Sequence, residues 1–190
     1  MVCVPVAGPW VLTPSATRVE YDLACPRRFV VAGLDAELSD RGIDIGFVGA
    51  LGSPVNPGIT TQRDSVFLGR LVRGHAPAAS FRPHIGCVPA SGGGQRVPTA
   101  VHLFPPGKPV DRHVVEVSAT RSRTVTARCP KNERLTGATH AIGSYSPAPP
   151  TAAFARGIHV TQRIARGAVK VAIASTVRAV VQIDLVCVPR

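Results

Sequence analysis

Four short landmarks occur twice in the same order along the chain, and this repetition constrains the fold more than any other feature. Ser-Ala-Thr-Arg begins at Ser15 and again at Ser118, and each copy continues with Cys-Pro and a Gly eight residues after the Cys. Thr-Gln-Arg and Cys-Val-Pro come next, and 26 residues separate the Thr from the last Cys in both copies. A fixed order of four landmarks predicts two related modules.

The landmarks place one module at 13–90 and the other at 112–190. Between them, 91–111 is rich in Gly and Pro, as expected of a linker. A third Cys-Val-Pro begins at Cys3. We therefore expect residues 1–12 to form a strand that resembles the end of a preceding module.

The hydrophobic pattern at the end of the second module predicts a β-strand. Odd positions from Ala179 to Cys187 are apolar, whereas Gln182 and Asp184 lie at even positions. This period of two is typical of a strand with one buried face. The same register in the first module predicts inward residues Ala79, Phe81, Ile85 and Cys87, and outward residues Arg82 and His84.

The rest of the chain also favours strands. Gly and Pro, with 18 residues each, occur throughout the chain and suit many short strands and turns. The stretches 30–38 and 43–49 flank Ser-Asp-Arg-Gly and predict a hairpin. Only Thr-Ala-Ala-Phe-Ala-Arg-Gly-Ile, from Thr151, resembles a helix. The predicted fold is all-β, with two tandemly duplicated sandwich-like or barrel-like modules, packed about a pseudo-twofold axis or arranged in tandem.

The five Cys residues leave one unpaired if disulfides form. Pairing within modules, Cys25 with Cys87 and Cys129 with Cys187, follows the module boundaries and is preferred. Pairing Cys3 with Cys25 and Cys87 with Cys129 is the alternative, and five buried thiols in a reducing cytosol are another. In the preferred scheme, Cys3 is a free thiol, pairs with another chain, or lies on a strand that docks on a neighbouring subunit.

The Cys-Pro opening, the Gly eight residues later and the closing Val-Cys strand resemble repeated β modules of secreted actinobacterial proteins. The resemblance covers both modules. It implies a secreted β fold but no general function. The Pro-rich linker and the absence of a signal-peptide pattern in residues 1–12 depart from it.

The net charge of +11 suits a polyanion such as nucleic acid, cell-wall polymer or acidic lipid headgroups, although Arg-rich composition also serves solubility. One segment concentrates basic side chains, and few aromatic residues for base stacking lie near it. The candidate polyanion-binding residues are Arg112, Arg121, Arg123, Arg128, Lys131 and Arg134.

No catalytic or cofactor motif stands out in the sequence. It has no nucleophile elbow, no phosphate-binding loop and no Cys or His spacing typical of zinc, so we expect no cofactor or metal. Asp35, Glu37, Asp40 and Asp44 are close together, but their spacing fits no calcium loop. Charged hairpin edges that discourage edge pairing explain these acids as well.

These features favour a non-enzymatic structural or assembly protein of a cell surface, extracellular polymer or virion, with itself or homologous subunits as partners. A binding module for an anionic polymer is the second interpretation. A secreted hydrolase without a recognisable motif is the third. No apolar run is long enough to cross a membrane. We expect an extracellular or virion location, or a cytoplasmic one if the thiols are reduced.

Overall fold

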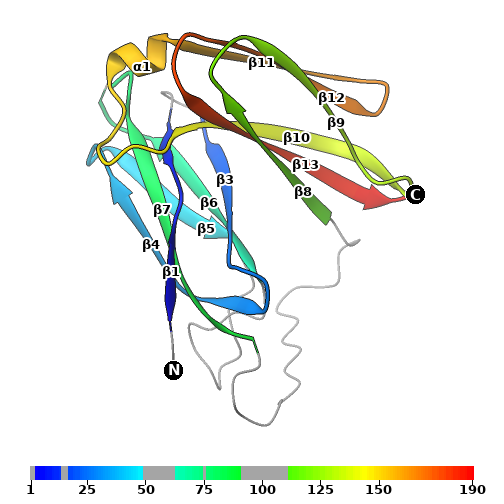
Figure 1. The fold of residues 1–190 in the computed structure, drawn as a ribbon, viewed down its shortest axis with the longest axis horizontal. Helices are drawn as coiled ribbons and strands as arrows, with labels where there is room; N and C mark the ends of the chain where they lie inside the picture. The colour runs from blue at the N-terminus through cyan, green and yellow to red at the C-terminus, as the bar shows by residue number, and fades with distance from the viewer. Residues whose placement is uncertain (1–2, 14–16, 49–62, 75, 91–110) are drawn as a thin grey trace.

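The computed structural model describes residues 3–13, 17–48, 63–74, 76–90 and 111–190 of the chain. These residues form 13 β-strands and one short helix, so the all-β prediction is confirmed. The strands make one large sheet and two small ones (Figure 1). Within the described ranges, no helix has the length and apolar character needed to cross a lipid bilayer.

The large sheet has seven strands: β1 (Val4–Ala7), β2 (Trp10–Leu12), β4 (Phe29–Leu38), β7 (Ser80–Pro89), β8 (Asp111–Ala119), β10 (Glu133–Ser144) and β13 (Ala179–Pro189). All neighbouring strands are antiparallel. Cys87 pairs with β1 and β4, and Phe81 pairs with β2 and β4. Across the sheet the order is therefore β4, β7, β1 and β2 end to end, β10, β13 and β8.

Two three-stranded sheets complete the fold. The first has the order β3 (Val19–Ala24), β6 (Asp64–Leu71), β5 (Ile43–Val48). The second has the order β9 (Arg123–Arg128), β12 (Ala168–Ser175), β11 (Ile158–Ala165). Helix α1 (Ala152–Arg156) lies in the stretch with weak helical character, and the Thr151 hydroxyl accepts a hydrogen bond from the Phe154 backbone N–H.

The two small sheets cover opposite faces of the large sheet. Val181 and Ile183 of β13 belong to the same core cluster as Val171 of β12. Gln182 lies between them in sequence and hydrogen-bonds to the backbone of β3. Because successive strand side chains point to opposite faces, the β9–β12–β11 sheet and strand β3 lie on different sides of β13 (Figure 1).

The predicted inward residues are buried, but the prediction of a single buried face is wrong for β13. Phe81 and Cys87 are fully buried in a cluster with Tyr21 and Phe67. Gln182 and Asp184, however, are each only 3% exposed. The physical reason is the packing of β3 on the face that a strand at the surface would show to water.

The predicted hairpin between 30–38 and 43–49 does not form. Both of its strands exist, but β4 pairs with β7 and β5 pairs with β6. The turn residues behave as expected, since Asp40 Oδ1 accepts a hydrogen bond from the Gly42 backbone N–H at 2.6 Å. This turn leads the chain from the large sheet into a small one, so its two flanking strands do not meet.

Both copies of one landmark, the Gly eight residues after the Cys of Cys-Pro, lie next to a shift in strand register. The β4–β7 register shifts between Val31 and Gly33, and the β10–β13 register shifts between Leu135 and Gly137. Each shift immediately precedes the Gly that stands eight residues after the Cys of Cys-Pro. An extra residue of this kind bends and twists the strand that carries it.

The Thr-Gln-Arg landmark, in contrast, does not coincide. Arg63 directly precedes β6, whereas Arg163 lies inside β11. Thr61 and Gln62 lie outside the described residues. Arg63 and Arg163 therefore occupy different places in the fold, despite their equal spacing from the closing Cys.

We predict that Gly69→Ala destabilises the protein, because a Cβ there would overlap the Phe81 ring and stand 2.9 Å from Thr13 Cγ2. Phe81 is fully buried within a core cluster. We expect a loss of about 2 kcal/mol in the free energy of unfolding, as for other overpacked cores. Urea denaturation would measure it. Gly46→Ala is the control, because its Cβ would meet Leu68 at an ordinary 3.8 Å. Equal stability of the two variants would contradict the prediction.

Candidate functional site

Two disulfides join the first strand of each small sheet to the closing strand of the same half. Cys25, after β3, bonds to Cys87 of β7, with 5.7 Å between their Cα atoms. Cys129, after β9, bonds to Cys187 of β13, with 5.9 Å between their Cα atoms. These are the pairs that the module boundaries favoured. Cys3 is a free, exposed thiol. Disulfides of this kind persist in oxidising surroundings such as the extracellular space.

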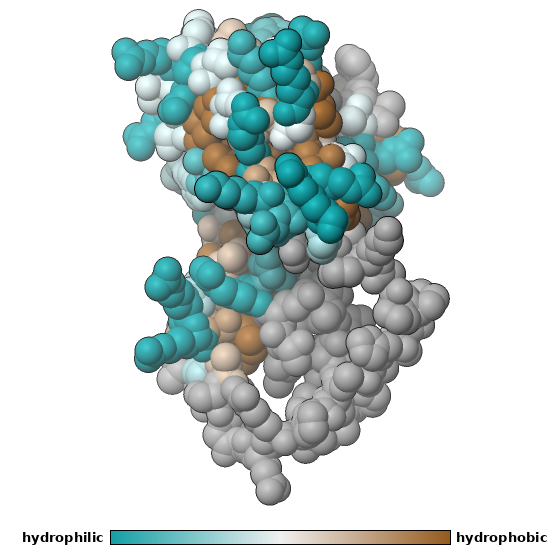
Figure 2. Space-filling model, turned by 90° about the vertical axis from the view of Figure 1, so that its right-hand side faces the viewer, coloured by the Kyte–Doolittle hydropathy of each residue, from teal (hydrophilic) through white to brown (hydrophobic). Residues whose placement is uncertain are grey.

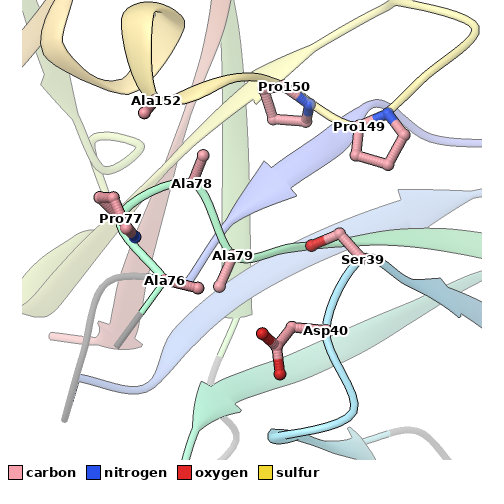
Figure 3. A pocket seen from close by; sticks show the side chains of 9 residues that line it. All are labelled: Ser39, Asp40, Ala76, Pro77, Ala78, Ala79, Pro149, Pro150 and Ala152. Atoms are coloured by element: carbon pink, nitrogen blue, oxygen red, sulfur yellow. The ribbon is translucent and has the colours of Figure 1, made fainter. Parts of the chain in front are cut away.

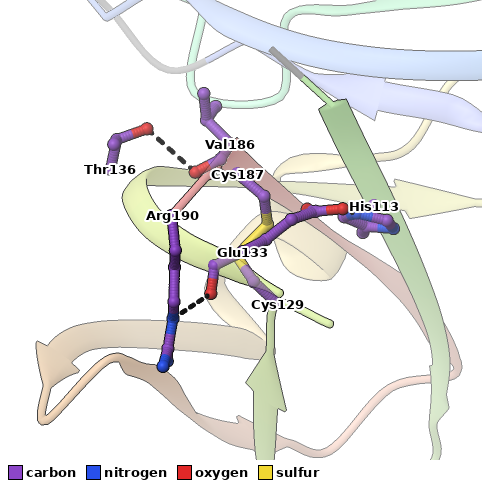
Figure 4. The surroundings of a disulfide bond; sticks show 7 residues. All are labelled: His113, Cys129, Glu133, Thr136, Val186, Cys187 and Arg190. Atoms are coloured by element: carbon purple, nitrogen blue, oxygen red, sulfur yellow. Dashed lines mark hydrogen bonds and ion pairs between the residues drawn. A yellow bond between two sulfur atoms is a disulfide. The ribbon is translucent and has the colours of Figure 1, made fainter. Parts of the chain in front are cut away.

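The surroundings of the second disulfide contain the one group of side chains in the described ranges with metal-ligand chemistry. His113 Nε2 lies 3.0 Å from Glu133 Oε2, close to the Cys187 sulfur (Figure 4). Metals bind the thiolate of Cys, and the Cys187 sulfur is held in the disulfide. That leaves two ligands, fewer than the three or four protein ligands of typical zinc sites. The group is better described as a hydrogen-bonded His–Glu pair between β8 and β10.

The candidate polyanion-binding residues form two groups rather than one strip. Arg121 and Arg123 lie at the start of β9, where Arg123 Nη1 donates to the Ser118 carbonyl at 3.3 Å. Arg128, Lys131 and Arg134 lie at its other end, all exposed. A strand rises by about 3.3 Å per residue, so Arg123 and Arg128 stand roughly 17 Å apart. Arg112 belongs to β8, but its side chain lies outside the described part.

The net charge of the chain lies mainly in its second half. Residues 112–190 contain twelve Lys and Arg and three Asp and Glu, whereas 13–90 contain eight and seven. Figure 2 views the molecule from the right-hand side of Figure 1, where hydrophilic side chains cover much of the upper part. The second half of the chain therefore carries most of the positive charge.

The two halves of the chain meet in the middle of the large sheet. Val11 and Trp10 of β2 pair with Gly143 and Ser144 of β10. The approach is close, because a Cβ at Gly143 would stand 2.9 Å from the Pro9 ring. The sheet therefore continues from one half into the other through a short antiparallel overlap.

Gln182 strengthens this junction by binding the edge of β3. Its Oε1 accepts from the Asp22 backbone N–H at 2.6 Å, and its Nε2 donates to the Asp22 carbonyl at 2.9 Å. β3 is an edge strand of its small sheet. The amide of Gln182 therefore occupies backbone groups that a further strand would otherwise bind. In the sequence, Gln182 is recognisable only as a polar residue at an even position of a strand. Nothing in the sequence indicates that it is buried.

Glu116 of β8 joins the junction through two tyrosines. Tyr21 Oη donates to Glu116 Oε2 at 3.1 Å, and Tyr145 Oη donates to Glu116 Oε1 at 3.4 Å. Burial raises the pKa of Tyr21 far above its usual range, and the nearby Glu116 charge adds to this. Burial also raises the pKa of Tyr145, although its hydrogen bond with Tyr21 acts in the opposite direction. Both hydroxyls therefore stay protonated donors at neutral pH.

We predict that alkaline pH weakens the protein through Tyr21. Its pKa is about 10 in an unfolded chain and higher in the folded protein, so the unfolded state releases its proton first. The stability from this group is complete below pH 10 and falls by about 1.4 kcal/mol per pH unit above it. Urea denaturation from pH 8 to 11 measures the slope. Tyr21→Phe should flatten it, whereas Tyr145→Phe, at an exposed position, should change it less. An unchanged slope in Tyr21→Phe would contradict the assignment.

Two depressions lie along the same junction. One, of about 320 Å³, is lined by Ser39 and Asp40 after β4, by 76–79, and by Pro149 and Pro150 before α1 (Figure 3). The other, of about 250 Å³, has Val19, Ala141, Ile142, His140 and His159 among its lining residues. Small apolar side chains dominate the first, and Asp40 is its one carboxylate.

Among the described strands, β4 and β8 are the outermost strands of the large sheet, and β1 also pairs on one side only, with β7. Within the part of the chain that the structure describes, no strand pairs with the outer side of β4 or of β8. These strands are long, with ten residues in β4 and nine in β8. An open edge carries backbone groups that can bind another strand.

Comparison of the chain with family models, curated proteins and solved structures finds no match. The resemblance to secreted actinobacterial modules therefore stays a prediction. The arguments for function rest on the disulfides, the junction, the open edges and the charge of the molecule itself.

Proposed function

We propose that the protein is a non-enzymatic structural component that works in an assembly outside the cell or on a virion. The observation that carries the proposal is the large sheet, which crosses both halves of the chain and ends in two long open edges. A soluble monomer usually shortens or covers such edges, and the acids Asp35 and Glu37 of β4 discourage pairing with a like edge. The two disulfides suit an oxidising location.

We also propose that the two halves are tandem copies of one module. The small sheets support this, because β3–β6–β5 and β9–β12–β11 have the same order relative to their position in the chain. In each half the closing strand, β7 or β13, pairs with the long strand that follows Cys-Pro. The disulfides and register shifts described above fall at corresponding places.

The N-terminal strands fit this scheme as the opening strand of the first module. Val4 of β1 pairs with Cys87, and Leu12 of β2 pairs with Ser80. In the second half, Asp111 of β8 pairs with Cys187, and Ser118 pairs with Val180. We therefore assign residues 4–12 to the place that β8 takes in the second module, in preference to the end of a preceding module.

Sedimentation velocity over a wide concentration range tests the structural role, with negative-stain micrographs of the same samples. We expect concentration-dependent oligomers, and regular rings or fibres in the micrographs. A protein that stays monomeric up to its solubility limit, without another subunit, would contradict a self-assembling component.

The excess of basic residues in 112–190 favours a second candidate function, the binding of an anionic polymer. Duplex DNA is a suitable probe, because each phosphate contact adds about 0.9 to the slope of log affinity against log salt concentration. Arg128→Glu with Lys131→Glu should weaken binding and reduce this slope. Arg27→Glu with Arg73→Glu, two exposed sites in the first half, is the matched control. Equal losses in both double variants would indicate attraction to net charge alone.

A further inference from the structure

The junction inside the chain joins two different edges. If the halves are equivalent, β2 in the first half corresponds to β8 in the second, and β10 in the second half corresponds to β4 in the first. The pairing of β2 with β10 therefore joins the β8-type edge of the first half to the β4-type edge of the second. An interface between unlike surfaces of equivalent units is heterologous, and it leaves one unused surface of each type.

The faces of the sheet show how such a junction repeats. Each half spans three strand positions of the large sheet, and every neighbour is antiparallel. The strands of the second half therefore run opposite to their counterparts in the first. The two small sheets accordingly lie on opposite faces of the large sheet. The halves are related by a rotation of 180° about an axis that lies in the sheet, perpendicular to the strands, together with a shift by three strands along that axis. A second application of the same operation restores the original orientation. The first half of a second chain can therefore follow the second half of the first chain.

We infer that the protein binds a second copy of itself head to tail, with the C-terminal end of β8 in one chain pairing antiparallel with the C-terminal end of β4 in the next. This inference rests on the proposed structural function and names its contact. Each contact uses the β8 edge of one chain and the β4 edge of the next, so one edge of each type stays unpaired at the ends of the assembly. The pairing can therefore repeat, and it builds rings or open filaments, depending on the curl of the sheet.

The internal register fixes which residues meet. Val11 pairs with Gly143. Val117 corresponds to Val11. Val117 pairs with Val181 of β13, and Val11 pairs with Phe81, which has the corresponding position in β7. Ser39 stands in the place of Gly143 by the matching registers of β4 and β10. Extending this register by one residue beyond the internal overlap places Leu38 opposite Ser118, and both residues are exposed in the single chain.

The internal pair Trp10–Ser144 maps onto Glu116 and Asp40, so two carboxylates face each other at this contact, and side chains of opposite charge lie beside them. Val19 and Ala141 line the same depression at the internal junction. Their counterparts are Arg123 of β9 and Glu37 of β4, both exposed. Between two chains, the apolar contact of the internal junction therefore becomes a contact of opposite charges. The acids of β4 would also repel a second β4 edge, which discourages pairing of like edges.

Cysteine cross-linking tests the register in the full chain. The parent is Cys3→Ser, which removes the exposed free thiol and leaves both disulfides. Leu38→Cys and Ser118→Cys are made in separate chains and mixed under mild oxidation. Directly opposite residues of an antiparallel pair lie about 4.5–5.5 Å apart between Cα atoms, within the range of a disulfide. We expect a covalent heterodimer, identified by mass spectrometry of the linked peptides.

Val114→Cys in place of Ser118→Cys is the matched control, because Val114 is exposed on the same face of β8, four residues away. The control should cross-link at least tenfold less. In sedimentation, Glu37→Arg and Arg123→Glu should each weaken association, and the chain with both changes should recover it. Oligomers without a preference for Ser118 over Val114 would overturn the head-to-tail contact while leaving the structural function in place. A monomer under all conditions would overturn both.

Discussion

Replacing Cys129 and Cys187 together with Ala lowers the free energy of unfolding by about 4 kcal/mol. The disulfide closes a loop with a sequence separation of 58, and the loss follows from the larger conformational freedom of the unfolded chain without it, in the usual entropic model. Both sulfurs lie against a buried core, and Cys187 is fully buried. Urea denaturation of the oxidised variant measures the loss directly.

The other disulfide provides an internal comparison. Its sequence separation of 62 is nearly the same, so Cys25 and Cys87 replaced together should cost an equal amount within a few tenths of a kcal/mol. Cys3→Ala is the control and should leave the stability unchanged, because Cys3 is exposed and free. A loss below 1 kcal/mol in either double variant would show that the unfolded chain stays compact without the bond.

The sequence predicted what the local pattern determines. Strict alternation from Ala179 to Cys187 defines a strand and its inner face, and the repeat carries that register to Phe81. The disulfide partners follow from the spacing as well, because each bond joins the Cys of a Cys-Pro to the Cys of the next Cys-Val-Pro. Each of these inferences needs only a period and a spacing.

The junction could not be predicted in that way. Gln182 and Asp184 look like residues at a solvated face, and nothing near them in sequence indicates that β3, about 160 residues away, covers them. The turn at Asp40 is equally ambiguous, because the same residues serve a hairpin and a change of sheet. The pairing of β2 with β10 depends on the packing of whole sheets, which no local period records.

We predict that Gln182→Leu lowers the free energy of unfolding by about 3 kcal/mol. Leu has a similar volume, so the packing changes little, but the backbone N–H and C=O of Asp22 lose the side-chain amide that binds them. Leaving a buried donor or acceptor unpaired costs about 1–3 kcal/mol each. Gln182 is 3% exposed, so water has little access to replace it.

The shape of the unfolding curve is as informative as its midpoint. In the wild type, the continuous sheet and the Gln182 contacts should make both halves unfold in one transition. Weakening the junction should separate the transitions of the two halves. Gln162→Leu is the control: its amide binds the Ala138 carbonyl at 2.8 Å within the second half, so its loss should lower stability without splitting the transition. If Gln182→Leu unfolds at the wild-type midpoint, the short overlap of β2 and β10 alone is enough to hold the halves together. The head-to-tail contact between chains would then need no counterpart of Gln182 to be stable.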